Sequence, residues 1–422
     1  RQIMTEMIRD RRCFMTKTIT DQQKYIFLII FVHDQVNISM KKLSLILILV
    51  IASLAAHAQA YQNSITARAE QRMRQIKDRA KAKQARILAE YDEFCRKVMK
   101  EWGDKEMVES TRKEWVEYSD DQRRRSIVDF ENGKVTVEVI ADPDEDEADI
   151  DSSLEKAVED LLSSKGKTIE YESEYIPQKD VTQTPIMDEQ IDMEKYGAKP
   201  DEKASKEEIA EQIVKEEKKE RRDVDTDNGR KTIVSIHLDL VEDHIPKRAE
   251  RFKGMIRKHS GRFSVNEPLI YALIEQESYF NPMAKSSANA YGLMQIVPKS
   301  GGRDAYMHIY KKDVIPTPEY LYDPDNNIEL GVGYLQKQMT VYFKGVSDPV
   351  CRMLCAIAAY NTGQGNVYYS LTGKRAMDGA VRKINTMNYD QLYAYLKVNL
   401  PHAETRDYIQ KVTSRMQKYI KQ

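Results

Sequence analysis

The spacing of hydrophobic residues changes near the middle of the chain, from a period of two to a period of three to four. Valine occupies every second position from 135 to 139, shortly after the pair Asn132-Gly133. Alternation of apolar and polar residues is typical of a half-buried strand, and an Asn-Gly pair accepts the positive φ angles of a tight hairpin turn. We therefore predict a β-hairpin whose strands are 126–130 and 134–140.

Other segments of the N-terminal part fit around this hairpin. Residues 67–102 are rich in Ala, Arg, Lys, Gln and Glu, which favours a charged helix, and 203–222 has the same character. Apolar residues alternate again over 234–240, as expected of a strand that returns to the same sheet. Two polar stretches are expected to be connectors: 142–151 and 223–230. The pattern predicts a small α+β domain over residues 61–240, and its residues indicate no chemistry.

From about residue 245 onward, apolar residues recur every three or four positions, which is typical of helices joined by short connections. The expected helices are 249–259, 269–277, 327–342, 350–360 and 405–420. Along the last of these, Tyr408, Ile409 and Val412 recur at helical spacing and form a packing face. We predict a mostly helical domain over residues 241–422, so the fold class of the whole chain is α+β.

The first sixty residues carry a different pattern. Residues 1–39 match no consistent element, and we interpret them as a mispredicted upstream extension. From Met40 a basic pair precedes an apolar stretch over 43–54, and small residues then lead to Ala60 in an A-x-A spacing. These are the parts of a secretory signal peptide, which we place at 40–60. An uncleaved membrane anchor is the alternative, although a spanning helix needs about 20 apolar residues.

Acidic and basic residues are balanced overall, with 66 Lys and Arg against 67 Asp and Glu, but they are unevenly distributed. Residues 245–422 hold 25 basic and 15 acidic residues, a net charge of +10, and the remainder carries −11. A basic domain favours an anionic polymer as partner, although solvated lysines explain the same excess. The sequence contains no nucleic-acid-binding motif and no ligand spacing suited to zinc or calcium. We expect no nucleic-acid partner, no metal and no cofactor.

One glutamate in the helical part continues an apolar helix face. Glu277 stands at position i+7 of a face that begins with Ile270 and contains Leu273 and Ile274. The neighbouring Glu275 is expected to point to solvent. A carboxyl held against apolar surface loses hydration, so its pKa rises, and a general acid near neutral pH needs such a pKa. The alternative is a glutamate that reaches solvent from the helix end, and the pattern alone leaves both interpretations open.

Four short motifs in a fixed order carry a family resemblance. They are Glu277-Ser278, Gly292-Leu293-Met294-Gln295, Ala359-Tyr360-Asn361 and Glu404-Thr405-Arg406-Asp407-Tyr408. Each is weak alone, but the ordered set resembles the soluble-lytic-transglycosylase family of peptidoglycan-cleaving enzymes, from about Val241 to the C-terminus. The resemblance implies a mostly helical, lysozyme-like catalytic domain, preceded here by the smaller α+β domain.

A second match concerns the predicted hairpin. Residues 118–122 and 125–135 are similar to the N-terminal domain of the membrane-bound lytic murein transglycosylase C family. That family resemblance implies a lipoprotein, which needs a cysteine directly after the signal core, yet no cysteine lies between Cys13 and Cys95. We therefore expect a periplasmic protein without a lipid anchor. Its N-terminal domain is a candidate for contact with cell-wall or outer-membrane partners.

The resemblance also implies a set of site residues around a single acid. Only Glu277 fits a desolvated catalytic position, because Asp304 is expected in a loop and Glu404 precedes Arg406. A glycosidase normally uses two carboxylates, unless the acetamido group of the substrate acts as nucleophile. Glu277 would then act as acid and afterwards as base, and would leave 1,6-anhydromuramoyl ends on the glycan strands of peptidoglycan. The implied substrate-binding residues are Ser286, Met294, Gln295, Tyr360, Asn361, Glu404 and Tyr408.

A structural role is the alternative for several of these residues. Tyr360 and Tyr408 are expected beside Glu277 or the acetamide, or else as hydrogen-bonded core residues. Gln295 either binds sugar or satisfies backbone groups, and Met294 is expected in the wall of a cleft or in the core. Two other functions stay open for the whole protein. They are a hydrolytic muramidase, which needs a second base and a positioned water, and a catalytically silent cell-wall-binding protein.

Overall fold

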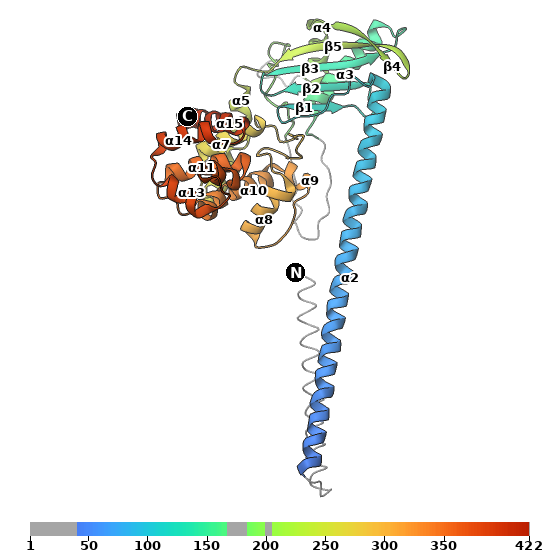
Figure 1. Ribbon diagram of the computed structural model, residues 1–422. Helices are drawn as coiled ribbons and strands as arrows, with labels where there is room; N and C mark the ends of the chain where they lie inside the picture. The colour runs from blue at the N-terminus through green and yellow to red at the C-terminus, as the bar shows by residue number, and fades with distance from the viewer. Residues whose placement is uncertain (1–39, 167–183, 199–204, 422) are drawn as a thin grey trace. The chain divides into compact units, whose positions relative to one another are not determined.

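The computed structural model describes residues 40–166, 184–198 and 205–421 (Figure 1). It consists of two compact units, residues 1–92 and 93–422. The extension predicted at residues 1–39 lies outside the described residues. The second unit contains both the sheet and the helices that position the site.

A single helix, α2 (Met40–Trp102), contains both the predicted signal peptide and the predicted charged helix. Its stretch Leu45–Ile76 is long and apolar enough, by length and composition alone, to cross a membrane, a test that signal sequences also pass. The length of the apolar core therefore does not exclude the anchor alternative, and the signal peptide stays a prediction. In the second unit the helix ends at Trp102, whose ring packs edge-on against Tyr118 of the sheet.

The N-terminal domain is built on a five-stranded antiparallel sheet with the strand order β1-β2-β3-β5-β4 (Figure 1). The strands are β1 (Glu114–Tyr118), β2 (Arg124–Asp129), β3 (Lys134–Ala141), β4 (Glu220–Thr226) and β5 (Gly229–Asp239). The predicted hairpin is confirmed, since Asp129 pairs with Lys134 across a turn in which Gly133 has a φ of 66°. The predicted return strand is confirmed as well, because β5 pairs with β3 in the centre of the sheet.

Helices α3 (Glu147–Ser163) and α4 (Lys206–Glu216) pack against each other, and α3 packs on the sheet. Three predictions were wrong here. The acidic stretch expected as a connector contains the start of α3, because Asp146 caps the helix and acidic side chains suit its positive end. The expected connector 223–230 is the hairpin of β4 and β5, and the predicted charged helix ends at Glu216 instead of residue 222.

The C-terminal domain is mostly helical with short connections, except for a longer loop over residues 279–297 that contains isolated β-bridges at Tyr291. Its elements are α5 (His244–Arg251), α6 (Lys253–Phe263), α7 (Glu267–Ser278), η1 (Pro298–Gly302), α8 (Arg303–Tyr310), α9 (Pro318–Tyr322), α10 (Pro324–Lys337), η2 (Gln338–Tyr342), α11 (Pro349–Thr362), α12 (Gln364–Thr372), α13 (Met377–Ile384), α14 (Tyr389–Asn399) and α15 (Ala403–Ile420). The fold class is α+β, as predicted.

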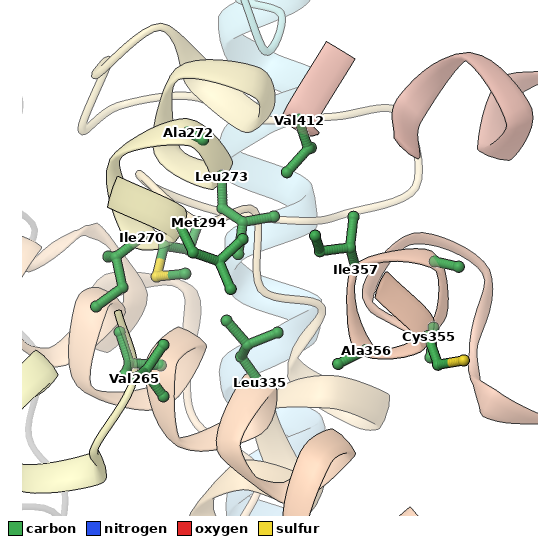
Figure 2. Packing of buried hydrophobic residues seen from close by; sticks show 14 of the residues in the cluster. Val265, Ile270, Ala272, Leu273, Met294, Leu335, Cys355, Ala356, Ile357 and Val412 are labelled. Carbon is green, nitrogen blue, oxygen red and sulfur yellow. The ribbon is translucent and has the colours of Figure 1, made fainter. Parts of the chain in front are cut away.

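Helix α7 packs against α6 and α15, and α15 also packs against α11. Figure 2 shows the side chains of Leu273, Met294 and Ile357 turned toward a common interior, together with Leu335 and Val412. All five are fully buried. The predicted packing face of the last helix is confirmed, since α15 lies along α7 and buries Tyr408, Ile409 and Val412. The apolar face predicted for α7 is therefore fixed by long-range packing.

A buried arginine joins the two domains within the second unit. Arg248 of α5 donates to the carbonyl oxygens of Tyr279 (3.0 Å) and Phe130 (3.1 Å) and to the side-chain oxygen of Gln190 (2.9 Å). Its guanidinium stacks on the Phe130 ring, with 4.6 Å to the centroid. Burial and the nearby charge of Arg251 lower the pKa of Arg248 to about 9. A cation in this position contributes hydrogen bonds that no apolar side chain can replace.

We expect Arg248→Met to lower the free energy of unfolding by about 2–4 kcal/mol, because three buried acceptors lose their donor. Denaturant unfolding of the full chain measures this change. The neighbouring Lys247→Met, which removes only an ion pair with Asp243 near the surface, is the control and should cost about 0.5 kcal/mol or less. An unchanged or higher stability of Arg248→Met would mean that the cost of burying the guanidinium outweighs its hydrogen bonds.

Candidate active site

The C-terminal end of α7 places Glu277 at the edge of the apolar interior. The helix ends at Ser278, one residue after the predicted end, and Tyr279 and Phe280 follow with φ angles of 50° and 61°. These left-handed residues turn the chain sharply away from the helix axis. Glu277 is consequently held in the last turn, and only 6% of the residue is exposed.

Glu275 contradicts our expectation that it points to solvent. It is 5% exposed, and its carboxylate accepts hydrogen bonds from Arg415 (3.2 Å) and Lys418 (3.1 Å) and one from the hydroxyl of Tyr419. All three partners belong to α15, which covers this side of α7. The spacing within α7 gave no indication of a neighbour from the far end of the chain. Glu275 is thus a paired carboxylate that ties α15 to α7.

The carboxyl of Glu277 has one hydrogen bond and one distant cation. The hydroxyl of Tyr408 donates to Oε1 at 2.6 Å, and a guanidinium nitrogen of Arg112 lies 3.9 Å from Oε2. Burial raises the pKa of Glu277 to about 7, although the Tyr408 hydrogen bond and the Arg112 charge lower it and the Glu404 charge adds to the rise. Near neutral pH both protonation states of this carboxyl are therefore populated, as a group that alternates between acid and base requires.

Two residues of the third motif lie near this carboxyl or near α15. Tyr360 is close to Glu277, and Asn361 contacts α15. Tyr360, at the end of α11, donates its hydroxyl proton to the carbonyl oxygen of Met294 at 2.9 Å. Burial and the charge of Glu277 raise the pKa of the Tyr360 phenol well above its ordinary value. Next to it, Asn361 accepts a 2.6 Å hydrogen bond from the hydroxyl of Thr405. The second, third and fourth motifs therefore meet the first at the end of α7.

The loop between α7 and η1 is held by its own side chains. Gln295 donates to the carbonyl oxygens of Ala284 (3.1 Å) and Gly292 (3.0 Å), and Ser286 accepts from the backbone amide of Ala290 at 3.1 Å. The amide nitrogen of Gln295 thus satisfies backbone groups, the structural role that we considered as the alternative. Ser286 is half-buried and close to the loop surface.

Met294 lies in the core, one of the two places that the sequence left open for it. Its side chain is fully buried and packs against helix α10 at Gly331, where an added Cβ would lie 2.3 Å from the sulfur. The predicted role as a substrate-binding residue therefore has no exposed side-chain surface to support it. Its contribution is to form the core beneath the site, while its carbonyl oxygen holds Tyr360.

Sequence reasoning missed Asn327, which fixes the same loop from α10. Its side chain accepts from the amide of Met294 at 2.7 Å and donates to the carbonyl oxygens of Tyr291 (2.8 Å) and Leu321 (2.7 Å). Gly292 is required at this contact, because its φ is 74° and a Cβ would lie 2.3 Å from the Asn327 amide. An asparagine in the first turn of a helix gives no signal of such a role, although Gly292 in the motif marks the close approach.

Arg112 was missed as well, because it belongs to the segment before β1 of the N-terminal domain. Its guanidinium lies 3.9 Å from Glu277 and 3.9 Å from Glu404. Glu404 has a side chain that is 71% exposed, so this carboxylate is well hydrated. Asp304 lies in α8 and not in a loop as predicted, and it is bound by Lys337 and the hydroxyl of Tyr342. Of the three carboxylates considered, Glu277 alone is buried without a close ion pair.

No metal site accompanies this arrangement within the parts of the chain that the structure describes. Over those residues, no group of three or more His, Cys, Asp or Glu side chains is suited to holding a metal ion. The groups that the structure places at the end of α7 are a buried carboxyl, which can transfer a proton, and tyrosine hydroxyls and amides, which can form hydrogen bonds.

Two family models match adjacent parts of the chain. Residues 80–251 match the "Membrane-bound lytic murein transglycosylase C, N-terminal domain" and residues 254–381 match the "Transglycosylase SLT domain". A 70 kDa soluble lytic transglycosylase from Escherichia coli is similar at 25% identity, with a TM-score of 0.30 over 42% of this chain and 25% of that one. The lytic transglycosylase Slt of Pseudomonas aeruginosa, in an inactive mutant, gives 28% identity and a TM-score of 0.30 over 40% and 23%.

Curated relatives match over most of their length. Membrane-bound lytic murein transglycosylase C from Klebsiella pneumoniae subsp. pneumoniae is 32% identical over 327 residues, which are 78% of this chain and 87% of the relative. The protein of the same name from Haemophilus ducreyi is 31% identical over 322 residues, 76% of this chain and 83% of the relative. The family resemblance found in the motifs is thus confirmed by sequence. This chain belongs to the membrane-bound lytic murein transglycosylase C family and is an enzyme of the lytic transglycosylase class.

Proposed function

We propose that this enzyme cleaves the β-1,4 bond between N-acetylmuramic acid and N-acetylglucosamine in peptidoglycan without consuming water. The product is a 1,6-anhydromuramoyl end. The observation that carries the proposal is one buried carboxyl, Glu277, with a pKa raised to about 7 and a single hydrogen bond from Tyr408. The family shows a lytic transglycosylase, and the identity of the acid and the course of the reaction are our inference.

In the first step, protonated Glu277 gives its proton to the glycosidic oxygen, and the bond from that oxygen to C1 of the muramic acid breaks. The oxygen of the 2-acetamido group attacks C1 and forms an oxazolinium-like intermediate. No second carboxylate is needed because the substrate supplies the nucleophile. The leaving N-acetylglucosamine carries the proton away on its hydroxyl group, and Glu277 is left as a carboxylate.

In the second step, the Glu277 carboxylate removes the proton from the C6 hydroxyl of the same muramic acid. The C6 oxygen then bonds to C1, the bond from C1 to the acetamide oxygen breaks, and the acetamide is restored. Glu277 ends the cycle protonated, so one group serves both steps. A pKa near 7 suits this exchange, because neither protonation state is costly at neutral pH.

The hydrogen bond from Tyr408 distinguishes the two oxygens of Glu277. Oε1 accepts the Tyr408 proton at 2.6 Å, so we assign Oε2 as the oxygen that carries and returns the catalytic proton. We retain Tyr360, Asn361, Ser286 and Gln295 as predicted substrate contacts. In that role Tyr360 and Asn361 present their polar groups from the end of α11, next to the helix that holds the acid.

The alternatives fit the site less well. A hydrolytic muramidase needs a second base beside the acid, yet Glu404 is largely exposed and Asp304 is paired in α8. A silent binding protein has no use for a carboxyl kept half-protonated at neutral pH. We further propose that the enzyme acts in the cell envelope as a periplasmic protein. The names of its relatives and the apolar start of α2 support this location.

Glu277→Gln should lower the rate of peptidoglycan cleavage by about 10²–10⁴-fold, because glutamine has nearly the same shape but cannot transfer the proton. Mass spectrometry of digested sacculi measures both rate and product, with anhydromuropeptides expected from the wild type. Glu267→Gln, which removes a carboxylate from the first turn of the same helix, is the matched control. Full activity of Glu277→Gln would refute the assignment of the acid, and reducing-end products from the wild type would indicate a muramidase.

The rate should fall as pH rises through about 7, because the proton needed in the first step is lost there.

The same pKa predicts a stability effect. The folded-state pKa lies above the ordinary 4.5, so the stability contribution of Glu277 is complete below about pH 4.5 and is lost as pH rises through about 7. Relative to wild type, Glu277→Gln should gain up to about 3 kcal/mol in unfolding free energy at alkaline pH. Equal stabilities at every pH would contradict the raised pKa.

Tyr408→Phe should lower kcat about tenfold or more and move the alkaline limb of the pH–rate profile to higher pH. The reason is that the lost hydrogen bond stabilised the carboxylate form of Glu277. Steady-state rates across pH measure both effects. Tyr419→Phe is the matched control. Tyr419 also donates a hydrogen bond from α15 to a buried glutamate of α7, but that glutamate is Glu275. If both variants behave alike, the effect of Tyr408 is structural.

A further inference from the structure

A short segment of the N-terminal domain runs directly beside the site. Residues 110–113 precede β1, and the carbonyl oxygen of Thr111 accepts from the backbone amide of Lys285 at 3.4 Å. Lys285 belongs to the loop that contains the motif glycine and Gln295. The N-terminal domain therefore contacts the loop of the site in addition to the helix that holds Glu277.

Both sides of Arg112 in this segment are fixed to the sheet. Ser110 exchanges hydrogen bonds with the backbone of Val116, and the carbonyl oxygen of Lys113 accepts from the amide of Phe130 at 2.9 Å. The Lys113 ammonium pairs with Glu131, which also accepts a 2.6 Å hydrogen bond from the hydroxyl of Tyr279. Tyr279 stands two residues after Glu277. The backbone at Arg112 is thus held at a defined place near the acid.

The guanidinium of Arg112 lies between two carboxylates without a close pairing to either. Its nitrogens are 3.9 Å from Glu277 and from Glu404, and 36% of its side chain is exposed. Both distances exceed the length of a charge-assisted hydrogen bond. At such a distance the cation acts on Glu277 by its charge and does not hold the carboxyl in a fixed ion pair.

We infer that Arg112 is a positioning residue of the reaction proposed above, by which the N-terminal domain supplies the positive charge that stabilises Glu277 while it is a carboxylate. The inference rests on the proposed role of Glu277. It gives the N-terminal domain a part in the chemistry, in addition to any contact with the cell wall.

Within the described part of the chain, the other groups found to act on Glu277 are neutral or negative. Tyr408 and Glu404 come from α15, and Tyr360 comes from α11. Tyr408 donates a hydrogen bond, whereas the Glu404 charge opposes ionisation of Glu277. In contrast to these three groups, Arg112 is a cation, and it balances the negative charge left when Glu277 gives up its proton. Without it, that charge would develop in a buried site next to another carboxylate.

The experiment is the pH–rate profile of the full chain with Arg112→Gln and Arg112→Lys, each checked for folding by unfolding titration. We expect Arg112→Gln to lower the maximal rate and to move the alkaline limb to higher pH. The ratio of the rate at about pH 8.5 to that at about pH 6 should rise about twofold or more. Arg112→Lys, which keeps the charge, should restore most of the wild-type profile. Arg124→Gln removes a cation of the same sheet that pairs with Asp121 and Asp160, and should leave the profile unchanged.

The outcomes separate this inference from the proposed function. If Glu277→Gln is inactive and folded Arg112→Gln keeps the wild-type midpoint, the role of Arg112 is refuted and the acid stands. An equal shift in Arg124→Gln would also refute it, since the effect would then come from net charge alone. If Glu277→Gln is active, the proposed function itself fails, whatever Arg112 does.

Discussion

The burial of one carboxyl at the end of α7 is the constraint on which the rest of the site depends. A carboxylate taken out of water is costly, so the site must either keep its proton or stabilise its charge. Helix α15 contributes to both. It covers α7, and its Tyr408 hydroxyl donates a hydrogen bond to Oε1 of Glu277. The result is a pKa of about 7, because desolvation and the Glu404 charge raise the value while the Tyr408 hydrogen bond and the Arg112 charge lower it.

Neighbouring structure is arranged so that this carboxyl cannot relax into solvent. The chain turns away immediately after α7 through two left-handed residues. Asn327 and Gly292 lock the loop that follows, and Tyr360 is bonded to the carbonyl oxygen of Met294 in that loop. On the other side of the helix, Glu275 is fully paired with α15. Two glutamates two positions apart on one helix are therefore both buried but differ in their partners. Glu275 is paired with two cations of α15, whereas Glu277 has no close ion pair.

The N-terminal domain takes part in the same arrangement. Arg248 bonds carbonyl oxygens of both domains, and Glu131, in the turn between β2 and β3, accepts from Tyr279 just after α7. These contacts explain why the sheet and the helical domain fall in one compact unit. They also place the segment before β1 at the acid, so the geometry at Glu277 depends on residues far apart in the chain.

Periodicity and turn chemistry in the sequence determined the central hairpin, the return strand, the main helices and the buried face of α7, because these depend on neighbours a few residues away. The edge strand β4 escaped prediction because its charged residues are mostly exposed and lack an apolar alternation. The motifs predicted Glu277, Tyr360 and Tyr408 as site residues. Only the tertiary structure decided that Glu275 is buried, that Met294 is core, and that Asn327 and Arg112 reach the site. Such contacts depend on how distant elements pack, and no local pattern encodes the partner of a side chain that lies a whole domain away.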